Sequence, residues 1–195
     1  REHLETDKRR KRPGGALYGP WHDLTTMIEG EAATALGDLG RERWRRAGGK
    51  ELARAKTPEG SAWPEDLAPQ FENVEIGIAR TRAEYDGAPA VHEIEKLFVE
   101  HIGRARKFIY AESQYFASRV AAEALARRLA EDNPPEVVLI NPLSAEGWLE
   151  PVAMDSARTQ LRHTLREVDR QCRFHIYVPY TGETPIYVHA KLMIV

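Results

Sequence analysis

The sequence predicts an α/β fold, in which a mostly parallel or mixed sheet is flanked by helices. From about residue 74 onward, short apolar runs alternate with segments whose apolar residues recur at helical spacing. This alternation is typical of repeated strand–helix–strand units, whose helices pack on the two faces of a sheet. The run Val137-Val138-Leu139-Ile140 is apolar throughout, as expected for a strand covered on both faces.

The individual elements follow from the same patterns. Alternating or continuous apolar residues predict strands over residues 23–28, 74–79, 107–111, 136–140, 173–178 and 186–194. Apolar residues at helical spacing predict helices over residues 31–47, 91–105, 120–129 and 152–168. Gly48-Gly49 is expected to end the first helix, and Pro134-Pro135 closes the third.

Between residues 50 and 73 the composition changes. Prolines 58, 64 and 69, Gly60 and scattered charges replace the periodic pattern, which indicates a connector. We therefore divide the chain into residues 1–49, a connector over 50–73 and a larger lobe over 74–195. The chain begins with Arg and ends inside an apolar run, so we expect a piece of a longer protein.

Composition and charge exclude several classes of protein. The net charge of −2 favours neither nucleic acid nor an anionic membrane as a partner. The lone Cys172 excludes an internal disulfide and a cysteine-based zinc site. No apolar run approaches the roughly 20 residues of a membrane span, so we expect a cytoplasmic or peripheral membrane location.

One basic run allows a membrane contact. The five cations Lys8-Arg9-Arg10-Lys11-Arg12 could touch anionic lipid headgroups, at about 1 kcal/mol each near such a surface. The alternative is a solvated loop, because Glu2, Glu5 and Asp7 lie close by.

The pair His189 and Lys191 carries the chemistry of the final strand. Side chains alternate along a strand, so both would point to one face, with Cα atoms about 6.6 Å apart. Lys191 can neutralise the oxygens of a phosphate, while His189 attacks phosphorus or protonates the leaving alcohol. The alternative is a buried strand whose two polar groups lie near its end.

Three stretches in order resemble the phospholipase D superfamily. His189-Ala190-Lys191 and its apolar run resemble the H-x-K-x4-D signature, whose Asp would fall one position beyond Val195. Residues 108–116, FIYAESQYF, are similar to the segment preceding the second signature, with Ser113 where the family usually has Asn. Residues 21–24, WHDL, then Gly30 and Arg43-Trp44, resemble the stretch that follows the first signature.

The resemblance implies a two-lobed enzyme, of which residues 1–49 are the end of the first lobe and 74–195 a truncated second lobe. Each signature of the family contributes one His and one Lys to a single site, and no metal or cofactor is needed. His189 would then be the general acid/base, and a first-signature His outside this sequence the nucleophile. This chain alone would be inactive.

Three further residues are candidates for the site. An active-site His needs a carboxylate on its second ring nitrogen, and the position of Asp23 resembles that of the family Asp that serves the first His. Gln114 and Glu112 follow a strand at the sheet end where α/β ligands bind. Gln114 could bind phosphate or orient His189, with Glu112 supporting it. Five other histidines are expected to be surface or structural residues: His22, His92, His101, His163 and His175.

These observations predict phosphodiester hydrolysis or phosphatidyl transfer on phospholipids through a phosphohistidine. A nuclease-type phosphodiesterase of the same superfamily is one alternative. A non-catalytic, membrane-associated scaffold lobe is another.

Overall fold

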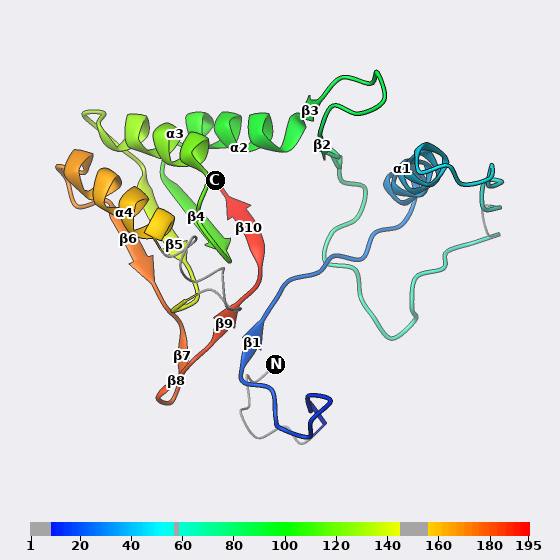
Figure 1. The fold of residues 1–195 in the computed structure, drawn as a ribbon, viewed down its shortest axis with the longest axis horizontal. Helices are drawn as coiled ribbons and strands as arrows, with labels where there is room; N and C mark the ends of the chain where they lie inside the picture. Colours follow the sequence, from blue (N-terminus) through cyan, green and yellow to red (C-terminus); the bar gives the residue numbers. More distant parts are fainter. Residues whose placement is uncertain (1–8, 57–58, 145–155) are drawn as a thin grey trace. The chain divides into compact units, whose positions relative to one another are not determined.

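The computed structural model describes residues 9–56, 59–144 and 156–195 (Figure 1). The chain divides into two compact units. One contains the N-terminal segment up to Leu24 together with Arg80–Val195, and the other is Thr25–Ala79. The N-terminal segment thus belongs to the same unit as the larger lobe. The assignment of two phospholipase D-like lobes stays a prediction.

The larger unit is built on a four-stranded mixed sheet, which confirms the α/β prediction. The strands are β4 (Phe108–Ser113), β5 (Glu136–Ile140), β6 (Phe174–Tyr177) and β10 (Lys191–Ile194), in the order β10-β4-β5-β6. Strands β4, β5 and β6 are parallel, and β10 runs antiparallel to β4. Strand β4 therefore lies inside the sheet with a partner on either side.

Three helices cover the sheet: α2 (Glu93–Arg104), α3 (Arg119–Leu129) and α4 (Ser156–Val168). Helix α3 contacts both α2 and α4, so the three form one layer (Figure 1). The prediction that helices cover both faces is wrong for the described part of this unit. Residues 152–155 of the fourth predicted helix lie outside the described residues.

The register of the strands separates the two faces of the sheet. Ile109, Val137 and Phe174 are register partners, and all three belong to the buried core beneath the helices. Tyr110 and Glu112 alternate with Ile109 along β4 and therefore lie on the opposite face. Tyr110, Glu112 and the His22 side chain that bonds to Glu112 form a cluster on that opposite face.

Two predicted strands are absent. Residues 23–28 and 74–79 have alternating apolar side chains but no strand partner. Their apolar residues remain exposed, as Leu24, Val74 and Ile76 show at 50%, 53% and 45%. Alternation predicts which side chains could share a face, and a strand forms only where a partner strand satisfies the backbone.

The smaller unit contains α1 (Glu31–Arg46), which confirms the first predicted helix. Gly48 follows its C-terminus with φ of 82°, a conformation that glycine adopts without steric cost. Arg41 and Arg54 donate hydrogen bonds to Asp38 of this helix. These bonds, that of Arg41 first, hold the pKa of the Asp38 carboxyl below its ordinary value.

The predicted final strand is broken into two. Residues 187–188 form β9 and pair in parallel with β1 (Trp21–His22), while β10 pairs with β4. His189 and Ala190 join the two pieces. We expected one continuous strand inside the sheet, but β10 lies at the edge of the four-stranded sheet as described. The remaining short strands form two hairpins: β2 (Thr81–Arg82) with β3 (Val91–His92), and β7 (Tyr180–Thr181) with β8 (Thr184–Pro185).

The helices of the described residues are all too short or too polar to span a membrane.

Candidate active site

His189 and Asp23 meet at the end of the parallel pair β1–β9. The Tyr187 N–H donates to the Pro20 carbonyl at 3.0 Å, and the His189 N–H donates to the His22 carbonyl at 2.8 Å. This register places Asp23, which follows β1, beside His189, which follows β9. Nδ1 of His189 consequently lies 2.8 Å from Oδ2 of Asp23.

The chemistry of the pair fixes the tautomer of the histidine. The hydrogen bond with His189, followed by a bond from the Leu24 N–H, holds the pKa of the Asp23 carboxyl below its ordinary value. An ionised carboxylate only accepts hydrogen bonds, so Nδ1 must carry the proton. Nε2 is therefore the nitrogen that can act on a substrate. It is also reachable, because the His189 and Asp23 side chains are 37% and 46% exposed.

This arrangement corrects one expectation. We expected Asp23 to serve a first-signature histidine outside this sequence, and the structure pairs it with His189 instead. The physical reason is the parallel pairing of β1 with β9, which joins residues 166 positions apart in the sequence. No local sequence pattern predicts such a pairing.

Lys191 lies beside the same pair. Its Nζ donates to the His189 carbonyl at 2.5 Å and contributes to the lowered pKa of Asp23. One of the three ammonium hydrogens is used in this bond, so two can still reach an anion. The side chain is exposed, which suits contact with a phosphate.

Aromatic side chains form one wall of the site. The Trp21 ring lies 4.7 Å from that of Tyr187 and 5.2 Å from the His189 ring, measured between centroids. The buried Gln114 donates from Nε2 to the Tyr187 hydroxyl at 2.8 Å. Gln114 therefore supports this wall. The expectation that it orients His189 directly does not match the hydrogen bond that the structure gives it.

Glu112 holds a second cluster, on the sheet face opposite the helices. It is only 8% exposed, and its carboxylate accepts from the Tyr110 hydroxyl at 2.6 Å and pairs with His22 Nε2 at 2.7 Å. Burial, followed by the hydrogen bond to Glu112, raises the pKa of Tyr110 to about 12. Glu112 thus bonds to Tyr110 and His22, whereas Gln114 bonds to Tyr187, so the expectation that Glu112 supports Gln114 does not match these hydrogen bonds.

Sequence reasoning missed four contributors to this region. Trp21 and Tyr110 lie in stretches that resemble the superfamily and Tyr187 precedes His189, but nothing in the sequence assigned any of the three a place in the site. Asn141 is 1% exposed at the end of β5 and donates from Nδ2 to the Ser113 carbonyl at 2.5 Å, which ties the ends of β4 and β5 together. Its signal was a polar residue between a continuous apolar run and Pro142.

Two other histidines form ion pairs with neighbouring glutamates. Nε2 of His175 pairs with Glu136 at 2.6 Å, as a structural residue would, and His163 pairs with Glu167 on the surface of α4. Arg173 is the first cause, and His175 a further one, of a lowered pKa at Glu136. Within residues 9–56, 59–144 and 156–195, no three His, Cys, Asp or Glu side chains are grouped as metal ligands.

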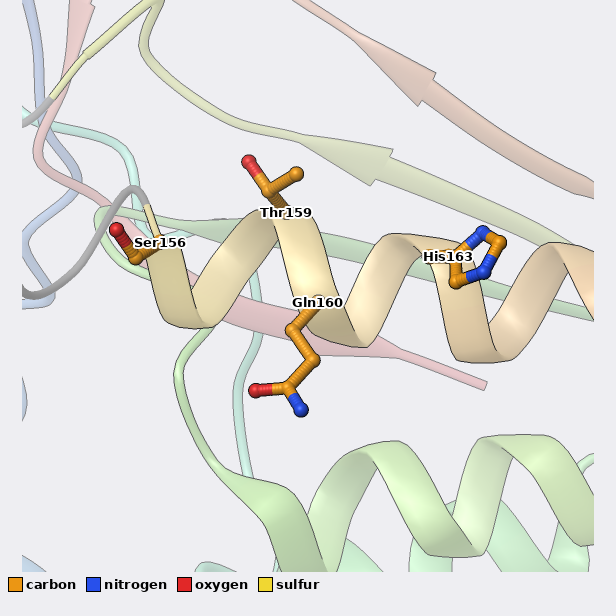
Figure 2. A pocket seen from close by; sticks show the side chains of 4 residues that line it. All are labelled: Ser156, Thr159, Gln160 and His163. Atoms are coloured by element: carbon orange, nitrogen blue, oxygen red, sulfur yellow. The ribbon is translucent and has the colours of Figure 1, made fainter.

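Two pockets differ in whether residues near His189 line them. One of 570 Å³ is lined by four exposed polar side chains that all come from helix α4: Ser156, Thr159, Gln160 and His163 (Figure 2). None of the candidate residues lines it, so we assign it no role. A smaller pocket of 250 Å³ is bordered by Trp21 and Tyr187, and also by Arg12 and Tyr18. It shares two aromatic side chains with the wall beside His189.

Comparison with known proteins supports the resemblance drawn from the motifs. Phospholipase D alpha 1 of Zea mays is 31% identical over 126 residues, and the enzyme of the same name from Oryza sativa subsp. japonica is 30% identical over 126 residues. Each match covers 52% of this chain and 16% of the relative, so the chain spans about a sixth of the length of these relatives. No protein-family model matches the chain. The resemblance to phospholipase D is thus confirmed over about half of the chain.

Proposed function

We propose that this chain supplies one half of the acid–base pair of a phospholipase D-type enzyme. The enzyme would hydrolyse phospholipid phosphodiesters, or transfer their phosphatidyl group, through a phosphohistidine and without a metal ion. One observation carries the proposal: Asp23 holds Nδ1 of His189, which directs a solvent-accessible Nε2 toward a substrate beside Lys191. The similarity to plant phospholipase D alpha 1 supports the same reaction class.

In the proposed first step, the phosphatidyl group is transferred to a histidine that lies outside these 195 residues. That histidine attacks phosphorus and forms an N–P bond, while the P–O bond to the leaving alcohol breaks. Protonated His189 donates its Nε2 proton to the departing oxygen, because an alkoxide is a poor leaving group. Lys191 stabilises the negative charge on the non-bridging oxygens, which increases toward the transition state.

The second step reverses the role of His189. Neutral His189 removes a proton from water or from an acceptor alcohol, whose oxygen attacks phosphorus and releases the other histidine. Water gives phosphatidic acid, and an alcohol gives a new phospholipid. Asp23 acts through His189 as a positioning residue, because it stabilises the imidazolium that forms when the base accepts this proton.

The second histidine must come from elsewhere. His189-Ala190-Lys191 is the only H-x-K in the 195 residues. The proposed active site is therefore completed by a lobe that carries the first signature. The 250 Å³ pocket at Trp21 and Tyr187 is a suitable place for part of the substrate. The exposed cations Lys11 and Arg12 give a proposed contact with anionic headgroups.

The decisive experiment separates the acid from the nucleophile. It uses a polypeptide that carries this chain together with a first H-x-K signature, assayed on phosphatidylcholine and on phosphatidyl-p-nitrophenol. A p-nitrophenolate leaving group barely needs a proton. The His189→Ala variant should therefore lose turnover on phosphatidylcholine, yet release a burst of nitrophenol and accumulate phosphoenzyme on the other histidine.

The matched control is His163→Ala, which removes an exposed imidazole on α4 and should leave both activities unchanged. No nitrophenol burst and no trapped phosphoenzyme in His189→Ala would assign His189 as the nucleophile. Cleavage of an oligonucleotide by the unmodified protein, with phosphatidylcholine left intact, would move the substrate class to nucleic acid. Full activity of His189→Ala would remove the residue from the mechanism and favour a scaffold lobe.

A further inference from the structure

The two-residue strand β1 delivers Asp23 to His189. Its backbone pairs with β9 over Trp21 and His22. The residues that follow, 23–27, are exposed and belong to no strand. A pairing of two residues is marginal by itself, so the position of Asp23 depends on what holds its neighbours.

His22 provides such a hold, because its side chain bonds to the interior of the sheet. Its Nε2 lies 2.7 Å from Oε2 of Glu112, which is 90 positions away in the sequence. Glu112 sits on β4 between register partners on both neighbouring strands, Ile140 of β5 and Leu192 of β10. The imidazole is thus hydrogen-bonded to a strand that has a partner on either side.

Tyr110 fixes the orientation of the carboxylate that receives His22. The Tyr110 hydroxyl donates to Oε1 of Glu112 at 2.6 Å, two residues earlier on the same face of β4. With Glu112 only 8% exposed and both of its oxygens bonded, its side chain has little freedom to rotate. The Oε2 atom therefore presents a fixed acceptor to His22.

The chain of contacts then reaches the proposed reaction centre. The carbonyl of His22 accepts from the His189 N–H at 2.8 Å, and the residue after His22 is Asp23, whose carboxylate meets Nδ1 of His189. One residue therefore touches His189 through its backbone and places the carboxylate that orients the imidazole. We infer that His22 is a positioning residue, which with Glu112 and Tyr110 fixes strand β1 so that Asp23 holds the Nδ1–H tautomer of His189.

This inference deepens the proposed function, on which it rests for the use made of His189. The test of this inference does not require the protein to turn over a substrate. The tautomer of His189 can be measured on this chain with ¹⁵N-labelled histidine, by long-range ¹H–¹⁵N correlation spectra at a pH where the imidazole is neutral. Free imidazole side chains favour the Nε2–H form, so a Nδ1–H signal reports the hydrogen bond to Asp23.

The unmodified chain should show Nδ1–H at His189, and Asp23→Asn should reduce that signal as a positive control. His22→Leu and Glu112→Met each remove the link to β4, so both should make Nε2–H the major form at His189. Amide exchange of His189 should become at least about tenfold faster in both variants, with the amides of β5 unchanged. His22→Gln keeps an N–H donor for Glu112 and should retain the Nδ1–H form.

A matched pair on the same sheet provides the control. His175 and Glu136 lie at 2.6 Å, so His175→Leu removes the same kind of contact and should leave the His189 tautomer unchanged. A folded His22→Leu variant that keeps Nδ1–H at His189 would overturn the inference. Global unfolding of both His22→Leu and Glu112→Met would also contradict it, since the pair would then stabilise the whole sheet and not one strand. Absence of phospholipase activity in the longer polypeptide would leave the tautomer result unaffected, so the two failures can be told apart.

Discussion

Asp23 and His189 lie 166 positions apart in the sequence, and a hydrogen bond of 2.8 Å joins the Asp23 carboxylate to Nδ1 of the imidazole. The same contact is the main cause of the lowered pKa of Asp23, with Lys191 a smaller one. A carboxylate that is bonded only in the folded state links the chemistry of the site to the stability of the fold.

Replacing His189 by Ala should therefore raise the pKa of Asp23 toward the ordinary value of about 3.9. Because the pKa of Asp23 is lower in the folded state, this bond stabilises the fold above about pH 4 and is lost as pH falls further. Carboxyl ¹³C NMR titration measures the shift. Asp38, whose pKa is lowered by Arg41 and Arg54 in the other unit, is the internal control and should titrate as before.

In a polypeptide with both signatures, His189→Ala should reduce kcat on phosphatidylcholine by about 10²–10⁴-fold, the usual contribution of a general acid. Lys191→Ala should reduce kcat as well, because it removes a charge that acts most strongly on the transition state. Asp23→Asn should cost less than His189→Ala, since the imidazole remains. Steady-state kinetics measure all three. Equal losses for Asp23→Asn and His189→Ala would mean that the two side chains act only as a unit.

This chain by itself should release no choline or glycerol from phospholipid, because it holds one histidine of the pair that the proposed reaction requires. Headgroup release from short-chain phosphatidylcholine, with the pure chain at high concentration, checks this expectation. Measurable turnover that disappears in His189→Ala would show that one signature, alone or in two associated copies, is sufficient.

Glu112→Gln should lower the pKa of Tyr110 from about 12, because it removes the negative charge beside the phenol. The pKa should stay above 10, since burial is the larger cause and remains. In the unmodified chain the pKa of Tyr110 is higher in the folded state, so folding is destabilised as pH rises from about 10 through 12. Labelled tyrosine ¹³Cζ spectra follow the ionisation, and Tyr110→Phe identifies the late-titrating signal.

Arg173→Ala should lower the stability of the sheet at neutral pH through its effect on Glu136. Arg173 is the first cause of the lowered pKa of this carboxyl, and His175 adds to it. The pKa of Glu136 is lower in the folded state, so the contribution is present above about pH 4.5 and is lost as pH falls below it. Both side chains are partly exposed, so the loss at pH 7 should be at most about 1 kcal/mol. Urea unfolding at pH 7 and at pH 3 tests this, and the two proteins should differ less at pH 3.

Local patterns were sufficient for the elements that have strong periodicity. The helices α1, α2 and α3 and the strands β4, β5 and β6 lie where apolar spacing placed them, because the apolar residues of each recur with the period of that element. The same rule failed at residues 23–28 and 74–79, where alternation exists without a neighbouring strand. Apolar alternation depends on one segment alone, whereas a sheet forms only when a second segment pairs with it.

The candidate site divides in a similar way. His189 and Lys191 could be named from the sequence because their residue types and spacing carry chemistry, and Asp23 because its position resembles that of a family carboxylate. The role of His22 could not, since an isolated histidine beside an aspartate has no spacing that points to Glu112.

The sequence by itself determined the α/β class, most helices and strands, and the histidine and lysine proposed to act on a phosphate. Only the tertiary structure decided which histidine Asp23 serves, where the last strand breaks, and that Glu112 holds His22 while Gln114 supports Tyr187. The reason is physical. Helical and strand periodicity arise from neighbours within a few residues, whereas these contacts join segments separated by 73–166 positions. Their geometry is set by the parallel pairing of β1 with β9 and by the register of β4 in the sheet.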